Sequence, residues 1–334
     1  MANFTAFGND LYTGARSIDF VGRRKLWYLI SAVLLLLAIA GPFLRGGYSF
    51  GIEFEGGSEF QVANVAGTAD RGIASDVVAS VAPDVAAEVT TIGAGTIRVQ
   101  TEPLPQEDTR EIREELATAY GVTLDDVSAS LVGPSWGADI TAQALRALVI
   151  FLVLVGIVMA LYFRTWKMSL AALVALVHDL VLTAGIYGIL GFEVTPAAVI
   201  GLLTILAYSL YDTVVVFDKI RENTSQDGEQ SRRTFSESVN LAVNQTLVRS
   251  INTSIVAALP VASILFIGAF VLGAGTLRDI ALALFIGILV GTYSTIFIAA
   301  PLYAQLREGE PETQRRGVRP ESVNRAANPS GAVR

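Results

Sequence analysis

Residues 144–163 read ALRALVIFLVLVGIVMALYF, a run of twenty residues in which Arg146 is the single charge. About 20 consecutive apolar residues in a helix span the hydrocarbon core of a bilayer, so this run predicts a transmembrane helix. Five other runs meet the same criterion: 26–44, 168–190, 196–217, 251–272 and 280–303. The sequence therefore predicts an α-helical polytopic membrane protein with six transmembrane helices.

The composition agrees with this class and excludes several others. Of 334 residues, 52% are hydrophobic and 16% charged, whereas soluble proteins carry about 25% charged residues. A net charge of −7 argues against a nucleic-acid partner. The absence of cysteine excludes disulfides and thiolate metal sites, and a single histidine excludes a multi-histidine metal site. We expect neither a metal nor a cofactor.

The distribution of Lys and Arg predicts the orientation of the spans. With the N-terminus inside, 17 of the 24 basic residues fall in the pieces on the cytoplasmic side, as the positive-inside rule requires. Those pieces are the N-terminal segment 1–25, the turn 164–167, the loop 218–250 and a polar tail 304–334 that we expect to be disordered. Both termini are then cytoplasmic, and residues 45–143 form an extracytoplasmic domain.

The first span has an alternative interpretation as a cleaved signal peptide. Arg23-Arg24-Lys25 resembles a basic leader, and Ala38-Ile39-Ala40 resembles a cleavage site. The apolar run is longer than a typical signal-peptide core and follows 25 polar residues, which favours an uncleaved helix.

The outer domain, 45–143, has an acidic composition and a readable α+β pattern. Strands are predicted at 58–64, 86–92, 96–101 and 126–132, and helices at 70–81 and 106–120. The order β-α-β-β-α-β is typical of a ferredoxin-like split βαβ unit. Such a unit leaves one sheet face free for a contact, although a passive spacer is the alternative.

Asp212 is the first candidate site residue, because charges inside spans are costly and mark functional positions by default. It lies six residues before Asp218, which marks the inner water boundary, so it lies about 9 Å deep at 1.5 Å per residue. A carboxyl group there can load and release a proton, or it can form a structural interhelical hydrogen bond. Ser209, Thr213 and Tyr211 are expected to surround it as a supporting polar network.

Arg249, His178 and Asp179 are the other ionisable candidates. Arg249 lies near the inner end of the antiparallel fifth span, at a depth that permits pairing with Asp212, or it extends to the lipid headgroups. Adjacent helix positions point about 100° apart, so His178 and Asp179 cannot both face one site squarely. We expect Asp179 to face the bundle, with His178 either a relay or a packed core residue.

Two further features indicate close helix packing. Gly287 and Gly291 form a GxxxG step in the sixth span, which lets helix backbones approach. Pro260 interrupts the fifth span and is expected to kink it.

Several ordered motifs resemble the SecF family of the bacterial SecDF protein-export complex, a relative of the RND superfamily of proton-driven transporters. They are DFVGRRKLWY (19–28), GIEFEGG (51–57), VGPSWG (132–137), LVHD (176–179), YSLYDTVVVFDKIREN (208–223), NQTLVRSINTS (244–254) and the run 277–302. The resemblance places the family's functional Asp and Arg on Asp212 and Arg249. Tyr211 departs from the Asn that the family usually carries before that Asp.

The resemblance implies a transport subunit and not an enzyme, with protons as the coupling ion. Its implied partners are SecD, the SecYEG channel, YajC and unfolded preproteins, in the lipid of the bacterial cytoplasmic membrane. It implies use of the proton-motive force to assist preprotein export after or alongside the SecA-driven step. The alternatives are a stand-alone RND-type exporter of small molecules and a non-transporting membrane scaffold.

Overall fold

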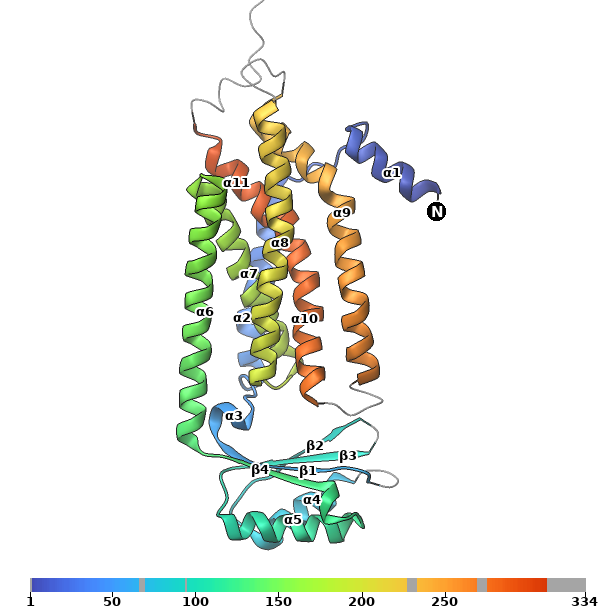
Figure 1. Ribbon diagram of the computed structural model, residues 1–334, viewed down its shortest axis with the longest axis vertical. Helices are drawn as coiled ribbons and strands as arrows, with labels where there is room; N and C mark the ends of the chain where they lie inside the picture. Colours follow the sequence, from blue (N-terminus) through green and yellow to red (C-terminus); the bar gives the residue numbers. More distant parts are fainter. Residues whose placement is uncertain (1, 66–69, 94, 227–232, 269–274, 311–334) are drawn as a thin grey trace, which may run out of the picture.

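The computed structural model has two parts, a bundle of long helices and a small α/β domain at one end of it (Figure 1). It describes residues 2–65, 70–93, 95–226, 233–268 and 275–310. Helix α1 (Ala2–Thr13) and the C-terminal end of the described chain both lie at the end of the bundle that is farther from the α/β domain. Within those residues, six helices are long and apolar enough to cross a membrane.

The spanning helices follow the apolar runs, and most of them extend beyond those runs. Their bounds are α2 (Arg24–Leu44), α6 (Pro134–Phe163), α7 (Trp166–Leu190), α8 (Pro196–Gln226), α9 (Phe235–Ser263) and α10 (Gly275–Ser294). The π turn η2 (Ile264–Gly268) continues α9, and the π turn η3 (Thr295–Ala299) joins α10 to α11 (Ala300–Arg307). Pro301 has no N–H to donate to the carbonyl four residues earlier, which favours a widened turn just before it.

The connection 218–250, expected as a loop, is largely helical. Helix α8 continues to Gln226, with an ion pair of 2.9 Å between Lys219 and Glu222 on its polar end. Helix α9 begins at Phe235 with a capping box in which Thr234 and Glu237 satisfy each other's backbone N–H groups. Both helices therefore extend into polar sequence, which hydropathy does not identify as helix.

Two other expected boundaries also differ from the structure. Helix α6 begins ten residues before the predicted span, because Pro134 at its first turn favours helix initiation outside the apolar run. Residues 304–307, expected in a disordered tail, form the last turn of α11. Lys167 pairs with Glu310 at 2.7 Å and thereby ties this end of the chain to the α6–α7 turn. The rest of that tail, 311–334, lies outside the described residues.

The bundle core is built on α7, α8 and α10. Helix α10 packs along α8 because Gly287 and Gly291 leave no side chain between the helices. A Cβ on Gly287 would collide with Ile205, and one on Gly291 would come within 2.9 Å of the Oγ of Ser209. The GxxxG step thus permits the close approach that the sequence predicts. Helices α2 and α6 pack on α7 at its other sides.

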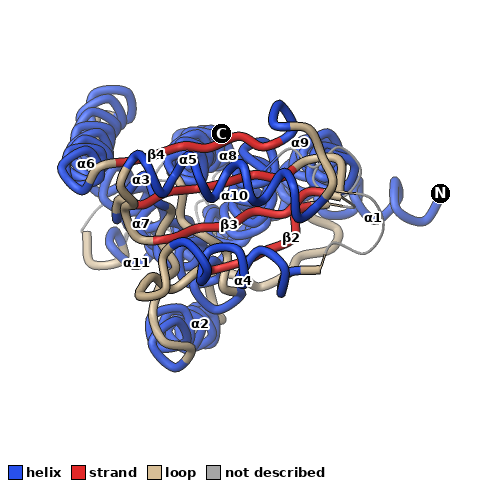
Figure 2. Tube along the Cα trace, turned by 90° about the horizontal axis from the view of Figure 1, so that it is seen from below, coloured by secondary structure: helices blue, strands red, loops and turns tan. Residues whose placement is uncertain are grey.

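The α/β domain is one antiparallel sheet with two helices on a single face. The elements are β1 (Gly57–Val62), α4 (Arg71–Val81), β2 (Glu88–Ile92), β3 (Thr96–Thr101), α5 (Gln106–Tyr120), η1 (Leu124–Asp126) and β4 (Val127–Val132). The strand order is β2-β3-β1-β4, and all neighbours are antiparallel. Viewed from the domain's end, α4 and α5 cover the sheet (Figure 2). Six membrane helices with a small antiparallel sheet confirm the predicted class.

Alternation along the strands gives this sheet two different faces. Phe60, Ile97 and Val99 are fully buried against the helices, together with Ile112 and Leu116 of α5. On β1 and β3, the residues that alternate with these buried ones point to the other face of the sheet, because side chains alternate along a strand. That second face is turned toward the helix bundle (Figure 1). A short helix, α3 (Ile52–Glu55), links α2 to β1 at this level.

The N-terminal segment is held to α9 by two asparagines. Asn240 accepts hydrogen bonds from the backbone N–H groups of Phe20 (2.8 Å) and Val21 (3.2 Å), and Asn244 accepts one from Ile18 (2.8 Å). Both amides also donate to the Ile18 carbonyl. The chain before the first span is therefore fixed against the helix that carries Arg249.

Candidate functional site: carboxyl groups between the membrane helices

Asp212 lies in the α8–α9 interface and is 7% exposed. Its Oδ1 accepts a hydrogen bond of 2.7 Å from the Oγ of Ser250 on α9. Its Oδ2 is buried and has no hydrogen-bond partner in the part of the chain that the structure describes. Asp212 therefore has one satisfied oxygen and one that is free to carry or accept a proton.

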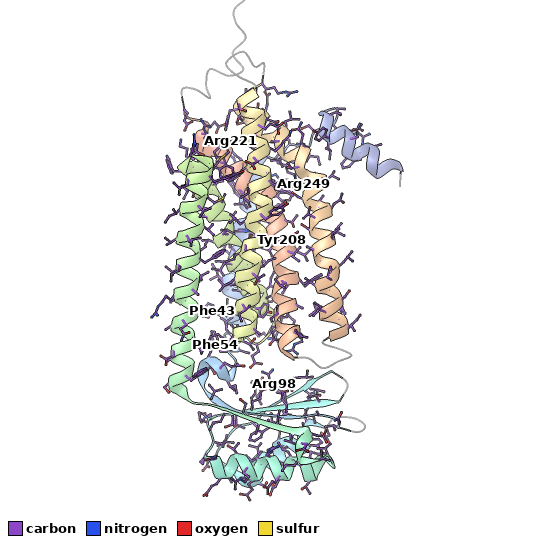
Figure 3. The ribbon with its side chains drawn as sticks, in the orientation of Figure 1. Phe43, Phe54, Arg98, Tyr208, Arg221 and Arg249 are labelled. Atoms are coloured by element: carbon purple, nitrogen blue, oxygen red, sulfur yellow. The ribbon has the colours of Figure 1, made fainter. Side chains whose placement is uncertain are left out.

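Arg249 does not pair with Asp212 in this structure. Its side chain is exposed, and its Nη2 lies 3.5 Å from the hydroxyl of Tyr211. Successive helix positions are turned by about 100°, so the face of α9 that directs Ser250 to Asp212 directs Arg249 to the outside. Figure 3 shows Arg249 on α9 between the levels of Arg221 and Tyr208 on α8. The switchable ion pair expected from the sequence therefore needs a rearrangement of the arginine side chain.

Asp179 and His178 form a second buried site at the contact between α7 and α8. The Oγ of Ser209 donates to Oδ2 of Asp179 at 2.5 Å, and Nδ1 of His178 lies 3.7 Å from Oδ1. The two residues are 2% and 5% exposed. The His178 ring stacks on Tyr293 with centroids 5.9 Å apart, and Tyr293 shares a hydrogen bond with Ser31 of α2. Asp179 thus faces the bundle as expected, and His178 is buried beside it.

The three residues expected to surround Asp212 as a polar network bond other partners in the structure. Ser209 bonds Asp179, and Thr213 shares a 2.9 Å hydrogen bond with Thr295 of the π turn η3. Neither hydroxyl forms a recorded hydrogen bond with Asp212, because each is taken up by another partner. Tyr211 contacts Arg249 and not the carboxyl group.

Ser250 is the residue that sequence reasoning missed. A signal for it exists, since Thr246, Ser250 and Ser254 recur every four residues and so share one face of α9. All three are buried. Ser254 also shares a 2.5 Å hydrogen bond with Thr292 of α10. A hydroxyl-lined stripe of α9 therefore faces α8 and α10, and the outer surface of the same helix carries Arg249.

The chemistry of this arrangement follows from the burial of its carboxyl groups away from water. A buried carboxylate without a full set of donors is unfavourable in an apolar bundle, while its protonated form carries no charge to solvate. Two such carboxyl groups are present, Asp179 at the α7–α8 contact and Asp212 at the α8–α9 contact, and among the described residues each has a single serine donor. The site can bind and release protons.

Comparison with known proteins gives the class of this fold and site. The sequence matches the family described as protein export membrane protein SecD/SecF, C-terminal, over residues 112–309. The protein translocase subunit SecF of Streptomyces coelicolor is 48% identical over 320 residues, 93% of this chain and 83% of its own length. The SecF subunit of Mycobacterium tuberculosis H37Rv is 43% identical, over 91% of this chain and 70% of its own.

A solved structure shares the fold over most of the chain. The crystal structure of SecDF from Thermus thermophilus, a translocon-associated membrane protein, matches with a TM-score of 0.76 and 30% identity. The match covers 88% of this chain and 39% of the SecDF chain. Together these matches define a multi-pass membrane protein with a role in protein transport. The chain belongs to the SecF family of protein translocase subunits.

Proposed function

We propose that this chain acts as a proton-driven motor subunit, which uses the proton-motive force to assist preprotein export across the bacterial cytoplasmic membrane. The assistance follows or accompanies the SecA-driven step. The observation that carries the proposal is the carboxyl group of Asp212, which is buried between α8 and α9; among the described residues, one of its oxygens has a serine donor and the other has no partner.

The coupling step is a change of charge at Asp212. When Asp212 is ionised, Arg249 turns inward to pair with it, and when Asp212 binds a proton, Arg249 returns to Tyr211 at the outer surface. One charge that crosses 100 mV supplies about 2.3 kcal/mol, which exceeds thermal energy several-fold. Asp179 and His178 of α7 extend the proton path from α8 toward α10, since Asp179 bonds Ser209 of α8 and His178 stacks on Tyr293 of α10.

The orientation follows from the charge distribution. Both termini lie in the cytoplasm, and the α/β domain lies outside, where it meets the emerging preprotein. We classify that domain as a ferredoxin-like split βαβ unit, on the basis of its element order and its strand order β2-β3-β1-β4.

The partners follow from the length of the SecDF match. This chain corresponds to 39% of the Thermus thermophilus SecDF chain. A separate SecD subunit would supply the remainder, and the pair would act at the SecYEG channel with YajC. Purification from gently solubilised membranes tests this, because a homotrimer without SecD would instead indicate a stand-alone exporter.

The test of proton coupling is Asp212→Asn, with Asp218→Asn on the same helix as the matched control. In sealed vesicles that carry the complex, we expect Asp212→Asn to abolish both proton flux and the gradient-dependent part of preprotein release. Asp218→Asn should retain both. Wild-type flux and release in Asp212→Asn would sink the proposal and leave a scaffold role.

A further inference from the structure

The sheet of the α/β domain presents polar side chains to the bundle. On the sheet face opposite α4 and α5, strand alternation places Glu59 and Gln61 of β1 beside Arg98 and Gln100 of β3. The apolar core of the domain lies on the other face of the sheet. Specific hydrogen bonds and ion pairs therefore determine how the domain docks on the bundle.

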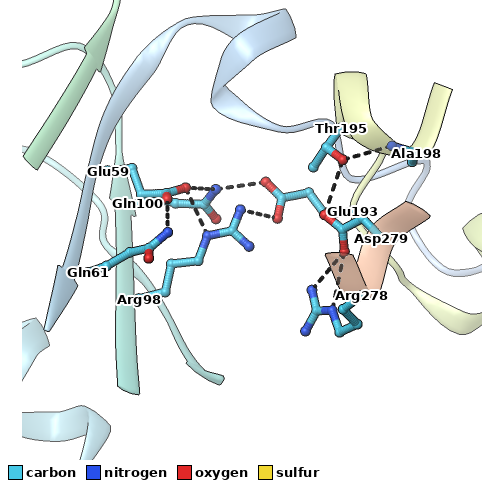
Figure 4. Close-up of polar contacts among 9 residues, drawn as sticks. All are labelled: Glu59, Gln61, Arg98, Gln100, Glu193, Thr195, Ala198, Arg278 and Asp279. Carbon is cyan, nitrogen blue, oxygen red and sulfur yellow. Dashed lines mark hydrogen bonds and ion pairs between the residues drawn. The ribbon is translucent and has the colours of Figure 1, made fainter. Parts of the chain in front are cut away.

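Arg98 lies at the centre of this contact and forms ion pairs with two carboxylates through two different nitrogens of its guanidinium (Figure 4). Its Nε lies 2.8 Å from Oε2 of Glu59 in its own sheet, and its Nη2 lies 2.5 Å from Oε2 of Glu193 in the α7–α8 loop. The Arg98 side chain is 9% exposed, and those of the two glutamates are 13% and 14% exposed. Burial lowers the pKa of Arg98, but the nearby Glu193 and Glu59 carboxylates raise it above its usual value, so the guanidinium stays charged.

Gln100 makes a second connection between the same partners. Its Nε2 donates to Oε1 of Glu193 at 2.7 Å and to Oε2 of Glu59 at 3.1 Å. Glu193 therefore receives a donor on each of its two oxygens, and both donors come from β3. A loop carboxylate that is held by two neighbouring side chains of a strand has a defined position relative to the sheet.

The α7–α8 loop is fixed to the membrane helices as firmly as to the sheet. Thr195 donates to Oδ2 of Asp279 on α10 at 3.1 Å and accepts the backbone N–H of Ala198 at 3.2 Å, which caps the start of α8. Val194 is bridged to Phe50 by two backbone hydrogen bonds, of 2.8 and 2.9 Å, to the neighbours of Phe50. Glu193 is thus two residues from the cap of α8.

Two cavities adjoin Arg98. One, of about 350 Å³, is lined by Glu53, Gln61 and Ile200 among others. Another, of about 170 Å³, lies on the Glu193 side against Arg278. The ion pair therefore lies between two cavities and is not enclosed by apolar side chains alone.

Helix α8 connects this contact to the buried carboxyl group. From Pro196 it continues without interruption past Asp212, a distance of about 24 Å at 1.5 Å per residue. A shift or rotation of α8 at Asp212 therefore also moves Thr195 and Glu193. Because Glu193 is bonded to Arg98, the same movement displaces β3.

We infer that the Arg98–Glu193 ion pair is the coupling between α8 and the α/β domain, and that it stays closed while the domain moves. Arg98 and Glu193 are positioning residues. They act through α8 and do not themselves bind or transfer the transported protons. The inference rests on the proposed proton-driven function of this chain. It assigns to a single loop the transmission of movement from the membrane helices to the outer domain.

The test measures proton flux and preprotein release separately in sealed vesicles. In Glu193→Gln and in Arg98→Gln, we expect release to fall at least about tenfold while proton flux stays within about twofold of wild type. Arg110→Gln, an exposed arginine of the same domain, is the matched control and should leave both unchanged. Asp212→Asn, measured in parallel, should lose both.

These readouts separate failure of the coupling from failure of the proposed function. Unchanged release in Glu193→Gln, or equal loss of flux and release, overturns the coupling whatever Asp212→Asn does. Wild-type behaviour of Asp212→Asn overturns the proton-driven function alone.

A covalent link gives a second test, in which a crosslink replaces the ion pair within a single variant. The chain has no cysteine, so Gln100→Cys with Glu193→Cys offers one reactive pair to a thiol crosslinker of matched length. We expect the double variant to be uncoupled and the crosslinked protein to regain release at unchanged flux. Crosslinked protein that conducts protons without release would show that the contact must open, and would overturn the inference.

Discussion

Ser250 controls the hydrogen bonding of the buried Asp212 carboxyl group, because its hydroxyl is the donor to Oδ1. A hydrogen bond to a charged group is worth about 1.5–3 kcal/mol, and a buried group that loses its partner bears the full cost of desolvation. Of the two states of the site, the ionised one therefore depends most on Ser250.

Ser250→Ala should accordingly slow proton-coupled release by about tenfold, since the ionised state loses its donor. The measurement is gradient-dependent release in sealed vesicles. Ser263→Ala is the matched control on the same helix, because Ser263 bonds only the carbonyl of Leu259 at an exposed position. Equal rates in the two variants would contradict the role of Ser250.

Asp126 gives a pH-dependent prediction outside the membrane. Hydrogen bonds from Thr123 and Asn64 hold the pKa of Asp126 below its ordinary value of 3.8. A carboxyl group with a lowered folded pKa stabilises the fold above its unfolded pKa, and that stability is lost as pH falls through the folded value. Asp126→Ala should therefore melt a few degrees below wild type at pH 7, and the gap should close below pH 3.8.

The check on this prediction is thermal unfolding in detergent across the pH range. The neighbouring exposed Asp125 supplies the control, since Asp125→Ala removes a carboxylate from the same turn. A gap between wild type and Asp126→Ala that is constant with pH would show that the carboxylate form is not what stabilises the turn.

At the scale of elements, the contact between α2 and α7 includes a close approach of the two backbones at Gly185. A Cβ on Gly185 would collide with the backbone and side chain of Ala38 on α2. Backbone atoms cannot move aside as a side chain does, so the helices must separate. Overpacking of this kind typically costs about 1–3 kcal/mol.

Gly185→Ala should lower the free energy of unfolding in detergent by about that amount. Gly156→Ala is the matched control within α6, because its Cβ would meet only the end of the flexible Leu173 side chain, at 3.1 Å. We expect little change there. If both variants melt together, close packing of α2 on α7 is not a determinant of stability.

The sequence predicts which elements exist better than where they end. Apolar runs locate all six spanning helices, but hydropathy reports where lipid begins and not where a helix begins. Trp136 and Thr141 lie in helix α6 although they precede the apolar run. In the same way, the charged residues after Asp218 continue α8 beyond the predicted span.

The candidate site is predictable in part for a related reason. Asp212 and Asp179 stand out because charge is rare in spans, and that signal needs no structure. Which hydroxyl meets which carboxyl group depends on the rotation of each helix, which composition does not specify. The Arg98–Glu193 contact joins residues from separate domains, and no local pattern links them.

At the scale of the whole molecule, the two parts are joined by the linker after α2 as well as by the α7–α8 loop. The backbones around Phe50 and Val194 pair in the parallel orientation, as two adjacent strands do. Adjacent strands lie about 4.8 Å apart, within the range of about 4.4–6.8 Å that Cα atoms of a disulfide require.

Phe50→Cys with Val194→Cys should therefore form a disulfide in high yield on mild oxidation, in a chain with no other cysteine. Alkylation with a maleimide of high mass reports the remaining free thiols. Leu44→Cys with Val194→Cys is the control, six residues out of register, and should stay reduced. Equal oxidation of both pairs would mean that linker and loop are not held in this register.

The crowding of the α7–α8 loop has a practical consequence for anyone who wishes to tag this protein. By length alone, the short turn at 191–195 looks like a convenient place for an epitope or a fluorophore. Every residue from Glu193 to Thr195 is engaged by another segment, however. An insertion there would break these contacts, so we expect the protein not to accept a reporter at this turn.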